Sequence, residues 1–241
     1  MNSTHASTLA PPRVLEAHER ERALALFLVL AGLFVASLVS CNLIFRKFFA
    51  WEVGGFTLEQ SVGLLPYPLT FLVTDVISEI YGRRKANLVV LSGLAASLVT
   101  LGIVTVAGVT EAATWSPVTN AEYDHVFGQT VLAVGASMAA YLLAQFFDVR
   151  IFHFWKGVTG GKHLWLRNNL STIPSQIVDT TSVLFLLCAV GEIAWGRFGT
   201  LLLNGVAFKA LIAALDTPLV YLAVGWMRRT FKLSPGQEIE L

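Results

Sequence analysis

Charged residues are scarce in this chain. Asp, Glu, Lys and Arg together make up 14% of its 241 residues, whereas hydrophobic residues make up 55%. Soluble domains carry about a quarter charged residues, so this composition argues against an ordinary soluble domain. Nothing in the length or composition indicates a second, soluble domain. We therefore expect an all-α protein that crosses a membrane.

Cysteine is also scarce, and the motifs of common nucleotide, metal and hydrolase sites are missing. Cys41 and Cys188 lie far apart in apolar stretches without metal-ligand spacing, which predicts buried thiols with no redox or zinc role. The run at 160–163, GGKH, lacks the spacing of a P-loop, and there is no H-E-x-x-H or G-x-S-x-G motif. We expect no metal, no cofactor and no catalytic residues. These absences weaken an enzyme reading without excluding it.

Long apolar runs are what the chain does contain. Six windows reach the roughly 20 residues that a helix needs to cross a bilayer. They fall at about 23–45, 62–81, 86–110, 126–147, 171–193 and 198–226. The sequence therefore predicts six transmembrane helices, with both termini on one side of the membrane.

The basic residues indicate which side that is. Thirteen of the 17 Lys and Arg residues fall in the two tails and in the two connections on the same side. Positive charge is enriched in cytoplasmic loops, so we expect both termini in the cytoplasm. The predicted organisation is a polar, unstructured cytoplasmic tail at 1–22, a transmembrane domain at 23–226, and a cytoplasmic tail at 227–241.

Three connections between the windows have recognisable character. Phe48–Ser61 is too short to span as a helix, so it is either a small extracellular hairpin or a re-entrant piece. The acidic and aromatic segment at 111–125 predicts a solvated outer loop. The basic and aromatic segment at 148–170 is typical of an interfacial helix that lies on the membrane.

Several charged residues fall inside the windows, where an ionisable group costs roughly 2.5–3.5 kcal/mol. Asp75 and Glu79 are four residues apart and share one helix face. Asp179 and Asp216 lie within about one turn of the depth of Asp75, and Lys209 lies about two turns further out. Such residues indicate a polar path or a solute site within a helical bundle.

The residue types allow either a proton or cation path or a site for a polar solute. Gln176 precedes Asp179 by three residues and shares its face, and Asn42 lies near the outer end of the first window. Gln and Asp together can offer acceptors and a donor to a flat heterocycle, and a carboxylate suits the adjacent N–H donors of a guanine-like edge. Tyr67 and Phe71 are candidates to sandwich such a ring.

Each feature also has a purely structural interpretation. Glu79 and Arg83 have the i,i+4 spacing of an ion pair that ends a helix. The run Asp216-Thr217-Pro218 can cap a helix that restarts at a proline break in the last window. Lys209 can form a structural ion pair with one of the buried aspartates.

Three ordered blocks then resemble one known family. They read CNLIFRK, PYPLTFLVTDVISEIYGRRKAN and WLRNNLSTIPSQIVDTTSVLF. Together these blocks are similar to the VUT-type queuosine-precursor transporter family, from about Leu24 to Trp226. The second block matches its pattern P-x(6)-D-x(3)-E-x-Y-G-R at Pro68, Asp75, Glu79, Tyr81, Gly82 and Arg83. The third matches R-x(3)-S-T-x(2)-S-Q-x(2)-D-T at Arg167, Ser171, Thr172, Ser175, Gln176, Asp179 and Thr180.

The resemblance implies an importer in the bacterial inner membrane. Its solutes would be 7-cyano-7-deazaguanine and 7-aminomethyl-7-deazaguanine, precursors of the tRNA nucleoside queuosine. The implied fold has six transmembrane helices, similar to the substrate-binding subunits of energy-coupling-factor vitamin transporters. The implied partners are the solute and the lipid bilayer, with no nucleic acid and no ATPase module. A homodimer is left open.

The resemblance also suggests a role for the buried polar residues. Asp75, Glu79, Gln176 and Asp179 would hydrogen-bond the guanine-like edge, with Asn42 and Lys209 close to the site and Tyr67 and Phe71 beside the ring. Two other classes of function stay open on the residues alone. One is a proton- or cation-translocating protein, or a membrane enzyme, that uses the buried carboxylates. The other is a purely structural membrane subunit.

Overall fold

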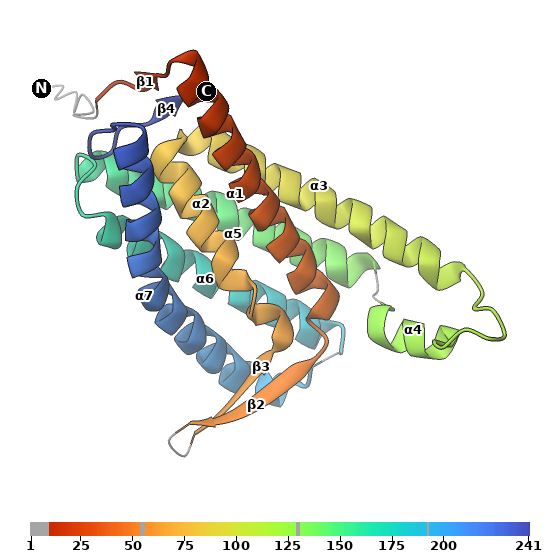
Figure 1. The fold of residues 1–241 in the computed structure, drawn as a ribbon. Helices are drawn as coiled ribbons and strands as arrows, with labels where there is room; N and C mark the ends of the chain where they lie inside the picture. Colours follow the sequence, from red (N-terminus) through yellow and green to blue (C-terminus); the bar gives the residue numbers. More distant parts are fainter. Residues whose placement is uncertain (1–9, 54–55, 129–130, 192) are drawn as a thin grey trace, which may run out of the picture.

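A computed structural model describes residues 10–53, 56–128, 131–191 and 193–241, and it is mostly helical. The described residues form seven α-helices, and the long ones lie side by side in one bundle (Figure 1). Their bounds are α1 Ala17–Ile44, α2 Tyr67–Ile80, α3 Gly82–Val109, α4 Asn120–Phe127, α5 Val131–Val158, α6 Leu164–Ala189 and α7 Phe198–Thr230. Single 3-10 turns, η1 Val62–Leu64 and η2 Trp195–Arg197, precede α2 and α7.

Four helices in the described part of the chain are long and apolar enough to cross a membrane. They are α1, α3, α6 and α7, the last counted together with η2. Their 26 to 33 residues correspond to about 39–50 Å at 1.5 Å per residue, which exceeds a hydrocarbon core of about 30 Å. Large apolar side chains such as Leu28, Ile103 and Leu203 point outward on these helices. The protein is therefore an all-α membrane protein.

The short helix α2 lies at the centre of the bundle, in contact with α1, α3, α5 and α7. Its 14 residues are almost all buried, including the polar Thr74, Ser78 and Glu79. The helix ends at Ile80, and Gly82, whose φ is +80°, lets the chain turn directly into α3. Because most of α2 is buried among the other helices, its polar groups must find their partners inside the protein.

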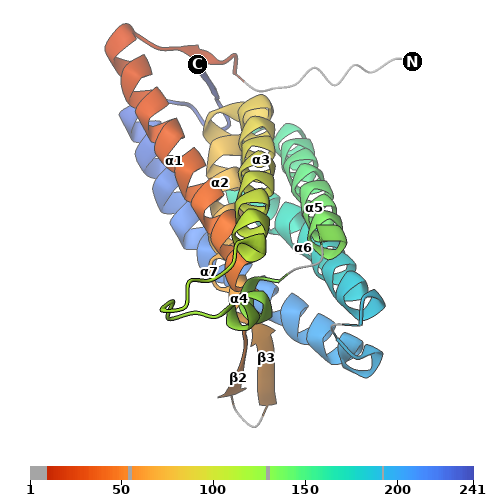
Figure 2. The same cartoon turned by 90° about the vertical axis from the view of Figure 1, so that its right-hand side faces the viewer.

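A β-hairpin closes one end of the bundle, which we call the hairpin end (Figure 2). Strand β2 (Phe48–Val53) pairs antiparallel with β3 (Phe56–Ser61). Of the two structures expected for this segment, the hairpin is therefore the one that forms. Ser61 then accepts a hydrogen bond from the Gly63 backbone N–H at 3.1 Å, which starts η1 and leads the chain into α2.

The first and last described segments of the chain meet at the opposite end, which we call the tail end (Figure 1). Strand β1 (Arg13–Val14) pairs in parallel with β4 (Ile239–Glu240). Arg13 also donates to the Phe231 carbonyl and pairs with Glu19 at 3.1 Å. The expectation that all of residues 1–22 are unstructured is therefore wrong, because these contacts order the chain from Arg13 and α1 begins at Ala17.

The predicted interfacial helix at 148–170 does not form. Instead, α5 runs on to Val158, and α6 starts at Leu164. Lys156 and Arg167, which were expected in a surface connection, are fully buried. The reason is tertiary: both cations have a carboxylate partner inside the bundle.

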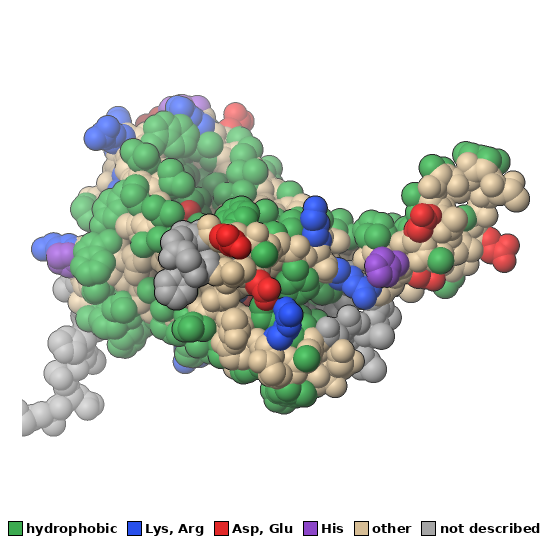
Figure 3. Space-filling model, turned by 90° about the horizontal axis from the view of Figure 1, so that it is seen from below, with side chains coloured by type: hydrophobic (Ala, Val, Ile, Leu, Met, Phe, Trp, Pro, Cys, Tyr) green, Lys and Arg blue, Asp and Glu red, His purple; other side chains and the backbone are tan. Residues whose placement is uncertain are grey.

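Two further expectations need correction, and one is confirmed. The outer 111–125 segment is exposed but contains the start of α4, where Thr119 and Glu122 form a capping box. This acidic segment projects from the bundle when viewed from the hairpin end (Figure 3). Helix α7 continues through Pro218 without restarting, and the Thr217 hydroxyl donates back to the Ala213 carbonyl at 3.0 Å. Cys41 and Cys188 are buried free thiols, as predicted.

We predict that Gly63→Ala destabilises the protein by about 1–3 kcal/mol, the usual cost of overpacking. A Cβ at this position would lie 2.7 Å from the Cys41 carbonyl oxygen and 2.9 Å from the Phe45 Cα, and backbone atoms cannot move aside cheaply. Thermal unfolding of the purified protein in detergent measures the change.

Gly32→Ala is the matched control for this substitution. No atom lies within 4 Å of a Cβ built there, so the variant should be as stable as the parent or more stable, by up to about 1 kcal/mol. Equal stability of the two variants would show that the turn at Gly63 does not pack against α1 as described.

Candidate functional site

A cavity of about 170 Å³ lies at the hairpin end, between α1, α2, α5, α6, α7 and the hairpin. One water occupies roughly 30 Å³ of liquid, so the cavity can hold several waters or one small solute. Most of its wall is apolar. The polar or ionisable side chains that line it are Cys41, Asn42, Arg46, Gln60, Ser61, Tyr67, Tyr141, Asp179, Thr180 and Lys209.

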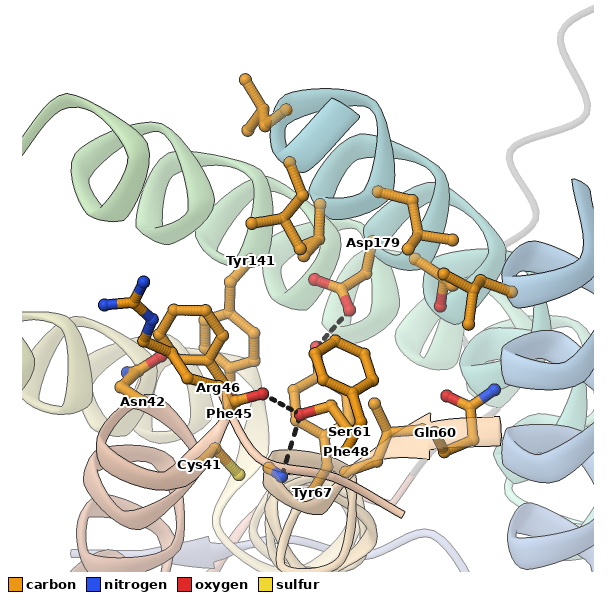
Figure 4. A pocket seen from close by; sticks show the side chains of 18 of the residues that line it. Cys41, Asn42, Phe45, Arg46, Phe48, Gln60, Ser61, Tyr67, Tyr141 and Asp179 are labelled. Atoms are coloured by element: carbon orange, nitrogen blue, oxygen red, sulfur yellow. Dashed lines mark hydrogen bonds between the residues drawn. The ribbon is translucent and has the colours of Figure 1, made fainter. Parts of the chain in front are cut away.

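Asp179 of α6 is the acidic group in the cavity wall (Figure 4). The Tyr67 hydroxyl donates to its Oδ2 at 2.5 Å, and the Lys209 ammonium lies 2.9 Å from the same oxygen. All three side chains are buried, with exposures of 8% or less. The Oδ1 atom of Asp179 has no hydrogen-bond partner among the described residues. One carboxylate oxygen is thus held in place, and the other is left to accept hydrogen bonds.

Two tyrosines give the cavity an aromatic wall. The rings of Tyr67 and Tyr141 lie 5.7 Å apart in an edge-on arrangement, and both line the cavity. The Lys209 ammonium also sits 4.3 Å from the centroid of the Tyr67 ring, a cation–π contact. Phe71 packs behind Tyr67 at 5.5 Å and does not line the cavity. Flat aromatic groups of this kind suit a flat solute.

Neutral polar groups complete the site. Gln60 of β3 is 5% exposed and its Nε2 has no hydrogen-bond partner in the described part of the chain. Asn42 lines the cavity near the end of α1 and donates to Ser97 Oγ at 3.3 Å. The Thr180 hydroxyl also lacks a partner among the described residues. The cavity therefore offers unused donors as well as an unused carboxylate oxygen.

Four of the predicted site residues line this cavity, namely Tyr67, Asp179, Asn42 and Lys209. The other four, Phe71, Asp75, Gln176 and Glu79, lie deeper in the bundle and outside its lining. Helix geometry explains the separation on α2, because Asp75 is eight residues from Tyr67, about 12 Å along the axis. Asp75 and Asp179, which were expected at a similar depth, therefore lie in different places. Asp179 is in the cavity wall, and Asp75 is deeper in the bundle.

Glu79 belongs to an ion cluster toward the tail end. It pairs with Arg167 at 2.9 Å and Lys156 at 3.6 Å, and also with Arg228. Lys156 in turn lies 2.9 Å from Glu238 of the C-terminal segment. The cluster ties α2, α5, α6 and α7 together with the tail, so it closes this end of the bundle.

The ion pair expected between Glu79 and Arg83 is not among those that Glu79 forms within the described ranges. Glu79 is fully buried, whereas Arg83 is exposed beyond the turn at Gly82. The turn directs Arg83 away from the face on which Glu79 lies. A continuous helix, which the i,i+4 expectation requires, does not exist here.

Sequence reasoning missed Tyr141 and Gln60, which both line the cavity. Tyr141 and Gln145 are polar residues four apart in an apolar helix, and the Gln145 side chain donates to the Tyr141 hydroxyl at 2.8 Å. That spacing was a usable signal. Gln60 had no such signal, because only the pairing register of β2 with β3 decides which side of the hairpin it occupies.

Comparisons with known proteins identify a transporter family. Residues 61–223, more than half of the chain, match a family model described as "Putative vitamin uptake transporter". A relative from Bacillus subtilis (strain 168), named "Probable queuosine precursor transporter", is 30% identical over 135 residues. That alignment covers 54% of this chain and 58% of the relative, so it spans a little over half of the relative's length. No solved structure matches the chain.

The buried ion pair between Asp179 and Lys209 generates a stability prediction. Lys209→Met leaves the Asp179 carboxylate buried without its cation, which we expect to cost about 3–5 kcal/mol. The double variant Lys209→Met/Asp179→Asn removes both charges and should recover most of that loss. Thermal unfolding in detergent measures both variants, and equal stability of the single and double variants would contradict a paired arrangement.

Proposed function

Because the chain belongs to the vitamin uptake transporter family, we propose that it imports 7-deazaguanine precursors of queuosine, in the cyano and aminomethyl forms. The name of the Bacillus subtilis relative supports this solute class. The resemblance of the three sequence blocks points to the same solute class. In this proposal the protein moves a small molecule unchanged and carries out no chemistry on it.

The observation that carries the proposal is the unpartnered Oδ1 of Asp179 in the cavity wall. A guanine-like edge presents adjacent N–H donors beside a carbonyl oxygen, and a carboxylate oxygen is a strong acceptor for such donors. The Gln60 Nε2, which is also unpartnered in the described chain, can donate to the carbonyl. Tyr67 and Tyr141 would then contact the face or edge of the ring. Together these groups match the flat, polar edge of a deazaguanine.

The two precursors differ in charge at their substituent. An aminomethyl group is cationic and would gain from a nearby carboxylate, whereas a cyano group needs a neutral donor. The cavity contains both kinds of group, since Thr180 and Asn42 line it together with Asp179. A single site can therefore accept both forms.

The proposed topology has six spans, formed by α1, α2, α3, α5, α6 and α7. Helix α2 would cross with the help of η1 and its burial among the other helices, because 14 residues alone extend only about 21 Å. The exposed basic residues at Arg83 and Arg84 lie at the tail end, which supports a cytoplasmic location for both termini in the bacterial inner membrane. The hairpin and the cavity would then face outward.

Assembly belongs to the same proposal. We propose that the fold is similar to the substrate-binding subunits of energy-coupling-factor vitamin transporters, and that import proceeds without an ATPase module. The absence of a P-loop spacing in the sequence supports this view. The protein would act as a monomer or as a homodimer in the bilayer.

Measuring queuosine in tRNA tests the proposed function. A bacterium unable to make its own precursors would express this chain and receive low concentrations of either precursor. We expect the unaltered protein to restore queuosine. Asp179→Asn should weaken apparent affinity by about 10- to 100-fold, the effect of losing one charged hydrogen bond.

Asp124→Asn on α4 is the matched control, since it makes the same chemical change at an exposed carboxylate. It should restore queuosine as the unaltered protein does. No restoration by the unaltered protein, despite its presence in the membrane, would refute the proposed function. Full restoration by Asp179→Asn would refute the proposed site alone.

A further inference from the structure

A second group of buried carboxyls lies below the cavity and takes no part in its wall. Asp75 of α2 and Asp148 of α5 are 1% and 0% exposed. Asp75 Oδ1 and both carboxyl oxygens of Asp148 have no hydrogen-bond partner among the described residues. Asp148 is the nearest strong charge acting on Asp75. Two adjacent carboxyl groups are thus buried with most of their oxygens unused.

A hydroxyl from a third helix is directed at the same place. The Thr172 side chain of α6 faces both carboxyl groups, and it is 2% exposed. Its Oγ1 has no hydrogen-bond partner in the described chain. Ser171 faces Asp148 beside it. The hydroxyl can therefore contact a ligand held between the two carboxyls.

None of the ion pairs within the described ranges includes Asp75 or Asp148. The further charges that act on Asp75 come from Glu79 of α2 and Asp216 of α7, and both are acidic. No charged residue occurs between Ala23 and Ile44 of α1 or between Ala86 and Val109 of α3. Because two unpaired carboxylates side by side in an apolar interior cannot both stay ionised, the pair must hold a positive ligand.

The nearest cations are already engaged elsewhere. Lys156, Arg167 and Arg228 pair with Glu79 in the tail-end cluster, and Lys209 pairs with Asp179 in the cavity. Within the described residues, no group of three or more His, Cys, Asp or Glu could hold a metal ion. A proton needs only one carboxyl oxygen, and a carboxyl that holds it is neutral, so one shared proton removes much of the cost of burying the pair.

One face of α5 connects the pair to the cavity. Tyr141 lines the cavity and accepts a hydrogen bond from Gln145, at 2.8 Å. Gln145 lies three residues before Asp148, on the same face of the helix, and its own Oε1 is buried without a partner in the described chain. A solute that contacts Tyr141 therefore sits two side chains away from the carboxyl pair.

We propose that Asp75 and Asp148 share one proton, and that each solute imported is accompanied by the passage of this proton. The inference rests on the proposed function and supplies its driving force. A proton from outer water reaches the pair through the cavity and binds one carboxyl oxygen. It leaves that oxygen for cytoplasmic water when the tail-end cluster opens, and the solute itself undergoes no bond change.

Accumulation of 7-cyano-7-deazaguanine in proteoliposomes tests this coupling, because this solute carries no net charge of its own. The full chain is reconstituted, and labelled solute is followed under a gradient of one pH unit, acidic outside. Coupling to one proton permits about tenfold accumulation at that gradient. Exchange of labelled for unlabelled solute without any gradient is measured in parallel.

The double variant Asp75→Asn/Asp148→Asn separates coupling from solute binding, since each amide has the shape of the protonated acid and neither can release a proton. We expect the rate of exchange to stay within about twofold of that of the unaltered protein. The ratio of inside to outside solute should fall from about ten to about one, and this tenfold loss corresponds to about 1.4 kcal/mol. Asp124→Asn, an exposed carboxylate on α4, should keep both activities.

Three results would overturn the coupling while leaving the proposed function intact. They are exchange without pH-driven accumulation in the unaltered protein, tenfold accumulation by the double variant Asp75→Asn/Asp148→Asn, and accumulation driven by a sodium gradient at equal pH. A lack of exchange by the unaltered protein would instead refute the solute class, and the coupling with it.

Discussion

The need to neutralise buried charge inside an apolar bundle governs this structure. Lipid offers no partner to a charged or polar group, so each such group on the central helix must be satisfied by another helix. Glu79 meets cations from α5, α6 and α7, and Tyr67 shares Asp179 with Lys209. These contacts set the positions of the helices around α2, and with them the shape of the cavity.

The polar groups are separated into three levels along the bundle. An acid paired with a lysine lies at the hairpin end, two carboxyls without a cation lie below it, and one buried carboxylate with three cations lies toward the tail end. Helix α6 contributes to all three, through Asp179, Thr172 and Arg167 at intervals of seven and five residues. A single helix thus contributes a polar side chain at each of the three levels.

Part of the site was predictable from residue type and spacing. Asp179 and Lys209 stand out because a charge inside an apolar window is costly, and an ion pair between Lys209 and a buried aspartate was one interpretation of them. Asp75 and Glu79 stood out for the same reason, but their distance from the cavity was not predictable. Depth along a helix is readable from sequence, whereas the direction of a side chain around a tilted helix depends on its neighbours.

Sequence alone was enough to show that this is a helical membrane protein and to which family it belongs. These properties follow from composition, from local periodicity and from short motifs. Only the tertiary structure decided that Lys156 and Arg167 are buried, that Gln60 reaches the cavity, and that Asp148 faces Asp75. Each of these depends on contacts between segments far apart in the chain, and electrostatic partners are chosen by distance in space rather than by spacing in sequence.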